Sequence, residues 1–106
     1  MLMPVLALAL LQGVCPMTIG VGKDGAIFTG RFYGWYRTSP NTLKSDLKGG
    51  CYNDSHPHAV TSVELVIAAG APKPRVDLVY SILQKEGWPP EKVQSKPWDK
   101  YPQQPR

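Results

Sequence analysis

The residue types with the most chemical potential gather in one short stretch of the sequence. Cys51, Asp54, His56 and His58 lie close together between two glycines and an apolar run. Alternation in an extended segment would place both histidines on one side of the chain, and thiolate, imidazole and carboxylate groups are ligands for zinc and related metals. The stretch is therefore a candidate metal- or small-ligand-binding loop. Because its spacing matches no established ligand pattern, ordinary loop histidines are the alternative, and we expect no resident metal or cofactor.

The cysteines admit two further interpretations. A nucleophilic Cys51 would need a histidine base in hydrogen-bond reach and a third group to orient that base. The sequence shows no such constellation, so we expect no catalytic residues and no enzyme activity. Cys15 and Cys51 are the two cysteines of the chain. They could form a disulfide in an oxidising compartment or remain two unrelated buried thiols, and the sequence leaves both open.

Three aromatic residues are candidates for binding a partner. Trp35, Tyr36 and Trp88 could anchor a protein at a sheet edge, or could serve as rim or core residues of the domain. The basic residues Arg31 and Arg37 flank the first two of these aromatics. The net charge of only +4 includes no clustered basic face, so we expect no nucleic-acid partner.

The N-terminal residues 1–11 form an apolar run that is too short to cross a bilayer, which takes about 20 residues. Its length is typical of a signal-peptide core, although no Lys or Arg precedes Lys23. The alternative is an apolar strand or helix packed on the domain. We therefore predict a periplasmic or otherwise exported chain, with membrane association left open, in which residues 1–15 are a hydrophobic segment, residues 16–96 the domain and residues 97–106 a proline-rich tail.

The elements that must position these residues follow from apolar periodicity. Residues 17–21 alternate as a strand, Asp24-Gly25 predicts a hairpin, and residues 26–33 predict a second strand. Ser39-Pro40 predicts the start of a short helix that ends at residue 48, and residues 51–61 show no apolar period and are expected to be a loop. The continuous apolar run at residues 62–68 indicates a central strand. An amphipathic helix ending at Gly87 and a short edge strand at residues 92–95 complete the series.

This order predicts a single two-layer α/β (α+β) domain with the arrangement β-β-α-β-α-β. A small mixed sheet would carry two helices packed on one face. The strand at residues 62–68 and the helix that follows it have the strongest apolar patterns, so they are expected to form the core.

The same order resembles the periplasmic domain of the ExbD/TolR biopolymer-transport family between Thr18 and Val93. The segments that carry the resemblance are residues 19–25 with Ile27, Ser39 with Leu43 and Leu47, residues 63–67, residues 75–79 and residues 85–87. The resemblance implies a non-enzymatic envelope module that binds a protein partner or a cell-wall polymer. It also implies a homodimer, an inner-membrane motor subunit as partner, and a role in transmembrane transport.

Two departures from the family pattern limit what the resemblance implies. Family members carry an essential carboxylate in a transmembrane helix, whereas residues 2–11 contain no Asp or Glu and are too few to span a membrane. The acidic residue common after the third strand of the family is replaced by Ala69, Gly70 and Ala71. The expectation is therefore a module that resembles the periplasmic domain alone, without proton coupling of its own.

Overall fold

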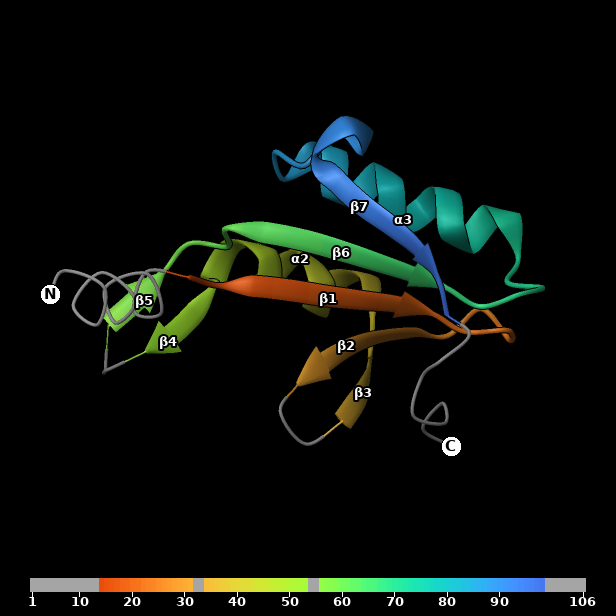
Figure 1. Cartoon of the computed structure of the whole chain (residues 1–106), viewed down its shortest axis with the longest axis horizontal. Helices are drawn as coiled ribbons and strands as arrows, with labels where there is room; N and C mark the ends of the chain where they lie inside the picture. The colour runs from red at the N-terminus through yellow and green to blue at the C-terminus, as the bar shows by residue number, and fades with distance from the viewer. Residues whose placement is uncertain (1–13, 32–33, 54–55, 99–106) are drawn as a thin grey trace, which may run out of the picture.

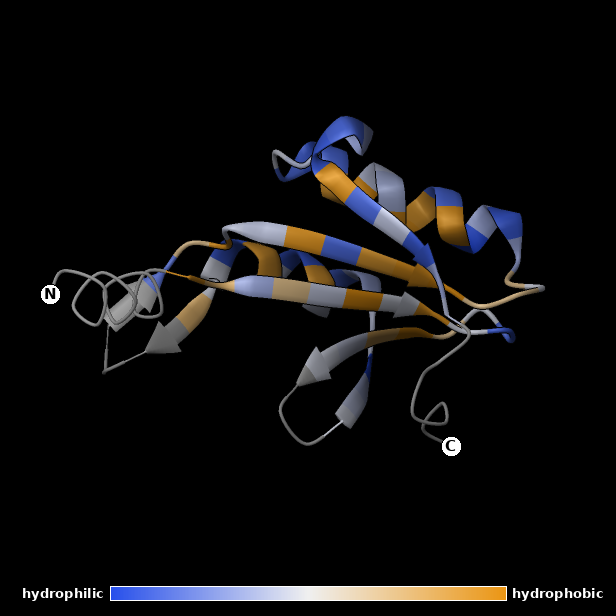
Figure 2. Cartoon of the chain, in the orientation of Figure 1, coloured by the Kyte–Doolittle hydropathy of each residue, from blue (hydrophilic) through white to orange (hydrophobic). Residues whose placement is uncertain are grey.

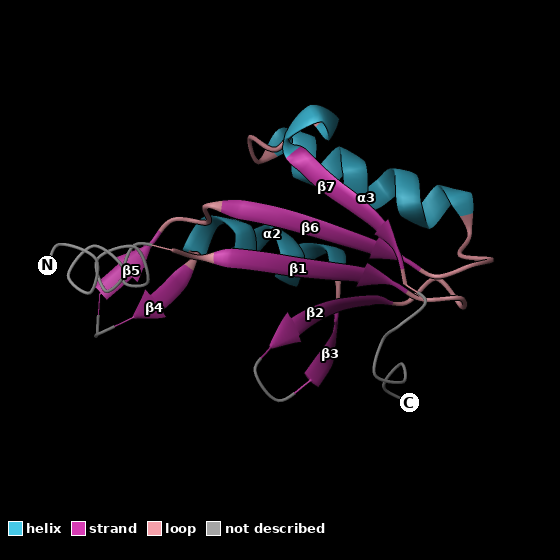
Figure 3. Ribbon diagram, in the orientation of Figure 1, coloured by secondary structure: helices cyan, strands magenta, loops and turns pink. Residues whose placement is uncertain are grey.

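The computed structural model describes residues 14–31, 34–53 and 56–98. Within these residues the protein is a mixed α+β fold with a five-stranded sheet and two helices, as the sequence predicts (Figures 1 and 3). The sheet strands are β1 (Pro16–Val21), β2 (Ile27–Arg31), β3 (Gly34–Thr38), β6 (Ser62–Ile67) and β7 (Val93–Pro97). The helices are α2 (Pro40–Gly49) and α3 (Lys73–Lys85), with a 3-10 turn, η1 (Pro90–Lys92), before β7.

The sheet has the order β3-β2-β1-β6-β7, so β3 and β7 lie at its edges. The hairpin partners β1–β2 and β2–β3 are antiparallel, while β1–β6 and β6–β7 are parallel. Helix α3 connects the parallel strands β6 and β7, because a parallel pair requires a crossover rather than a tight turn. The central positions of β1 and β6 explain why their apolar patterns are strong.

Both helices cover one face of the sheet. Ile19 and Val21 of β1 share a buried cluster with Leu43 and Leu47 of α2 and with residues of β2, β6, α3 and β7. Alternate residues of a strand point to opposite faces, so the intervening Gly20 faces the other side. Figure 2 shows hydrophobic bands on β6 and along α3, the strand and the helix that contribute Val63, Leu65, Val79, Ile82 and Leu83 to this cluster.

The predicted turn and helix ends show the side-chain hydrogen bonds and the glycine conformations that the sequence predicts. The Asp24 carboxylate accepts a hydrogen bond from the Ala26 N–H (3.0 Å), and Gly25 takes a positive φ of 88°. The Ser39 hydroxyl accepts from the Thr42 N–H (3.2 Å) at the start of α2. Gly87, with φ 94°, lies just beyond α3, as a C-terminal glycine should.

Three segments differ from the sequence prediction. Residues 34–38 form the edge strand β3, which pairs with β2 across a short connection. Residues 51–58, expected as loop, contain a two-stranded ladder formed by β4 (Cys51–Asn53) and β5 (His56–His58). These strands are too short and too polar for periodicity to reveal them. At the other end, β7 continues to Pro97, and Trp98 is buried against the sheet, so the first two residues of the predicted tail belong to the folded unit.

Candidate functional site

Cys15 and Cys51 are joined in a disulfide. Their Cα atoms lie 5.7 Å apart, and the bond links the residue before β1 to the first residue of β4. Cys15 is buried, and both its backbone N–H and its carbonyl oxygen form hydrogen bonds with Thr61. The Cys15 N–H donates to Thr61 Oγ1 (2.8 Å), and the Thr61 N–H donates to the Cys15 carbonyl oxygen (2.9 Å). The disulfide therefore fastens the start of the central strand to the β4–β5 ladder.

The candidate metal loop is only partly assembled. Register places His58 directly opposite Cys51 and His56 opposite Asn53, while Asp54 lies outside the described residues. The Cys51 sulfur is bonded to Cys15, so it is neither a thiolate ligand nor a nucleophile in this state. With the disulfide formed, no group of three His, Cys, Asp or Glu side chains over residues 14–31, 34–53 and 56–98 is arranged to hold a metal ion.

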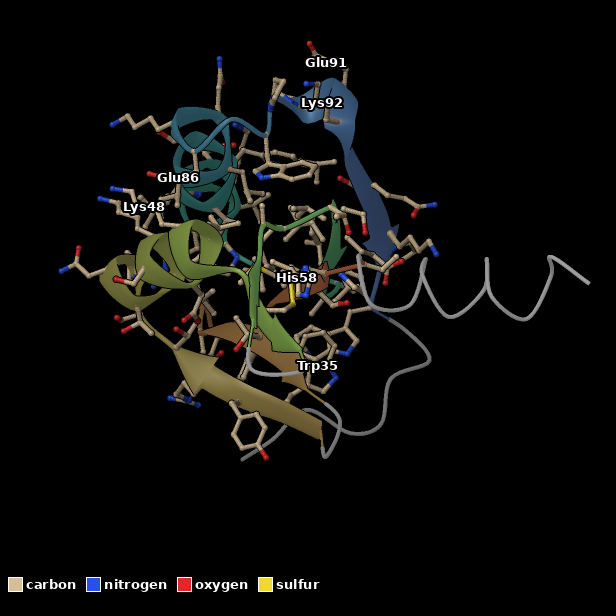
Figure 4. The ribbon with its side chains drawn as sticks, turned by 90° about the vertical axis from the view of Figure 1, so that its left-hand side faces the viewer. Trp35, Lys48, His58, Glu86, Glu91 and Lys92 are labelled. Atoms are coloured by element: carbon tan, nitrogen blue, oxygen red, sulfur yellow. A yellow bond between two sulfur atoms is a disulfide. The ribbon has the colours of Figure 1, made fainter. Side chains whose placement is uncertain are left out.

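The three candidate partner-binding aromatics have different environments. Trp35 is buried on the face of the sheet opposite α2 and α3, so its indole is a packing residue and does not project as an anchor (Figure 4). Trp88 is half-buried and packs against the main core. Tyr36, by contrast, keeps half of its surface exposed (50%). Of the three, Tyr36 alone has the exposure that a contact residue needs.

Tyr36 and its neighbour Arg37 in β3 point to opposite faces of the sheet. Tyr36 pairs with Thr29 of β2, and the adjacent Arg37 pairs with Phe28. The Arg37 guanidinium lies over the Phe28 ring (5.6 Å to the centroid) and 3.8 Å from the Asp24 carboxylate. Both members of this ion pair are well exposed, so it contributes little to stability. The β3 edge thus presents the exposed Tyr36 on one face of the sheet and the exposed Arg37 on the other.

The opposite edge, β7, is protected against strand addition. The Val93 N–H donates to the Pro90 carbonyl oxygen, and Pro97 has no N–H. Lys96 forms an ion pair with Glu64 (3.0 Å) on the neighbouring strand. Lysine and proline on an edge strand are the usual means of discouraging another strand from pairing.

The sequence did not predict the aromatic cluster on the face opposite α2 and α3. The Trp98 ring lies edge-on to Phe28 (centroids 5.6 Å apart) and tilted against Trp35 (4.7 Å). It rests on Gly20, where no side chain separates the ring from the backbone of β1. The signal in the sequence was weak: a glycine inside an alternating strand indicates a close approach but does not identify the residue that approaches.

A shallow pocket of about 70 Å³ lies beside the disulfide. Its lining includes Cys15, Cys51, Thr29 and Asp46. Binding sites for drug-sized molecules occupy roughly 300–1,000 Å³. The pocket therefore has room for a water molecule or an ion but not for such a ligand.

One titratable group is clearly perturbed among the described residues. The hydrogen bond and ion pair with Asp77 (2.8 Å, one helical turn away) raise the pKa of Lys73 above the ordinary lysine value of 10.5. This pair is exposed on α3 and lies in no pocket. It supports the helix and indicates no acid–base chemistry.

Comparison with family models, curated proteins and solved structures finds no match to this chain. The resemblance to the ExbD/TolR periplasmic domain accordingly remains a sequence-based expectation. In the part of the chain that the structure describes, neither helix is long and apolar enough to cross a membrane.

Proposed function

We propose that this chain is a non-enzymatic interaction module of the cell envelope that binds a protein partner beside the edge strand β3. The proposal follows the resemblance to the periplasmic domain of ExbD/TolR proteins. The exposed Tyr36 carries it, because tyrosine is among the residue types enriched in binding hot spots.

Two features support this choice of compartment and edge. The Cys15–Cys51 disulfide is typical of exported proteins, in which thiols are not kept reduced. The β7 edge is blocked by Lys96 and Pro97, whereas β3 contains neither lysine nor proline. A partner strand that pairs with an edge of the sheet would therefore be hindered less at β3 than at β7.

The alternative of an exported metal- or small-ligand-binding protein has less support. The disulfide removes the Cys51 thiolate from the proposed ligand set. The pocket beside it is too small for an organic ligand of ordinary size. For the disulfide-bonded protein we therefore retain the interaction module.

Site-specific photocrosslinking in the native host tests the proposal. A photoreactive amino acid is placed at Tyr36 and, as a matched control, at Gln94 of β7, which is also exposed on an edge strand. We expect a discrete adduct from position 36 and none from position 94, and the mass of the adduct separates a second copy from another protein. Equal adducts at both positions, or none at position 36, would contradict the proposal. Adducts that contain only cell-wall material would replace the protein partner with the polymer.

A further inference from the structure

Three potential metal-binding side chains converge around the disulfide. Cys15 comes from the segment before β1, Cys51 opens β4, and His58 closes β5. Cys51 and His58 are directly opposite in the β4–β5 ladder, where paired Cβ atoms lie about 4.5–5.5 Å apart and point to the same side. Figure 4 shows His58 beside the disulfide bond. Two sulfurs and an imidazole are thus brought together from three separate segments.

The backbone holds this arrangement closely. A Cβ atom added at Gly50 would lie 2.0 Å from the His58 carbonyl oxygen, so only glycine fits before Cys51. The Gly50 N–H is bound to the carbonyl oxygen of Asp46 in α2 (2.9 Å). The position of His58 relative to Cys51 is therefore set by contacts of the backbone as well as by the disulfide.

We propose that reduction of the Cys15–Cys51 disulfide converts this cluster into a zinc site with Cys15, Cys51 and His58 as ligands. Thiolate and imidazole together form the ligand set that zinc prefers in tetrahedral sites. A water molecule can supply the fourth ligand, as it does in zinc sites with three protein ligands. This inference does not rest on the proposed function.

A dithiol can serve as the reductant of the Cys15–Cys51 disulfide. Thiol–disulfide exchange transfers two electrons and two protons to the protein disulfide and leaves the reductant as a cyclic disulfide. Zinc then displaces the two thiol protons to solvent, because the ligands are thiolates. With zinc–sulfur distances of about 2.3 Å, the sulfurs must separate to roughly 3.7 Å in a tetrahedron. Cα atoms 5.7 Å apart allow this by rotation of the two side chains.

Cobalt titration of the full-length chain tests the site. The protein is reduced with excess dithiothreitol, freed of reductant without oxygen and titrated with Co²⁺, whose thiolate charge-transfer absorption reports sulfur ligation. We expect binding by the reduced protein, none by the oxidised protein, and displacement of Co²⁺ by Zn²⁺. Far-ultraviolet circular dichroism of the same samples reports whether the reduced chain keeps its fold.

Two histidine variants discriminate the ligand set. His58→Gln should weaken Co²⁺ binding by more than about tenfold, since even residues that only orient a ligand contribute that much. His56→Gln, two residues away in the same strand and opposite Asn53, should leave binding unchanged. Equal binding by wild type and His58→Gln would overturn the proposal. So would a reduced protein that binds no Co²⁺, or one that unfolds and does not regain its circular dichroism when Co²⁺ is added.

Discussion

The indole of Trp98 lies directly on the backbone of Gly20. A Cβ atom added to Gly20 would be 2.7 Å from Cζ3 of Trp98, which is closer than two non-bonded carbon atoms approach. Trp98 follows edge strand β7, and Gly20 lies in the central strand β1. The missing side chain in β1 therefore creates the space in which the residue after β7 is buried.

Replacing Gly20 with alanine should displace Trp98. The added methyl group forces the indole out of its position, and overpacking of this kind costs about 1–3 kcal/mol. Urea unfolding should show the loss of stability. The tryptophan emission should shift to longer wavelength as the Trp98 ring becomes hydrated.

Two controls separate this clash from a general effect of alanine. Gly49→Ala, at the end of α2, meets no atom within 4 Å and should leave stability unchanged or slightly raised. In a Trp98→Ala background, Gly20→Ala should lose most of its cost, because the ring that it strikes is absent. Strictly additive costs in that double variant would contradict the contact.

The disulfide should contribute substantially to stability. It closes a loop between residues 36 positions apart, for which the chain-entropy relation gives about 4 kcal/mol. The double variant Cys15→Ala/Cys51→Ala should therefore unfold at markedly lower urea concentration than the oxidised protein. Reduced wild type, measured without metal, should match the double variant. A difference below about 1 kcal/mol between oxidised protein and variant would indicate that the bond adds no constraint.

Tyr80 of α3 forms a hydrogen bond with Ser95 of β7, which connects the helix to the edge strand. A double-mutant cycle with Tyr80→Phe and Ser95→Ala should give a coupling free energy of about 0.5–1.5 kcal/mol, the net contribution of a typical hydrogen bond. The free energies of unfolding of all four proteins provide the measurement. A coupling near zero would show that solvent satisfies both hydroxyls equally well.

The Lys73–Asp77 pair should give a small pH dependence at alkaline pH. The folded-state pKa of Lys73 is raised above 10.5, so the pair stabilises the protein below that value. This stabilisation is lost as pH rises through the folded-state pKa. Titration of the Lys73 side chain by nuclear magnetic resonance should show a raised pKa, which returns towards 10.5 in Asp77→Asn. An unchanged Lys73 titration in that variant would rule out Asp77 as the cause.

Much of the fold could be predicted because its central elements have strong local patterns. The alternation in β1, the continuous apolar run in β6 and the four-residue spacing in α3 each specify a buried face within one segment. The Asp24-Gly25 turn and the Ser39 cap depend on neighbours in sequence alone. Such elements can be predicted without knowledge of the rest of the chain.

The candidate site was harder to predict, because its properties depend on distant residues. The sequence named Cys15 and Cys51 as a potential pair, but only the path of the chain brings their Cα atoms to 5.7 Å. It could not distinguish Trp35 from its neighbour Tyr36. The register of β3 on β2 decides that one is buried and the other exposed.

By itself, the sequence determined the α+β class, the order of the main strands and helices, and the candidate residues. Tertiary structure alone decided that residues 34–38 become an edge strand, that His58 stands opposite Cys51, and that Trp98 covers Gly20. The physical reason is that local periodicity specifies which face of an element is buried, whereas pairing and packing between distant segments specify what that face meets.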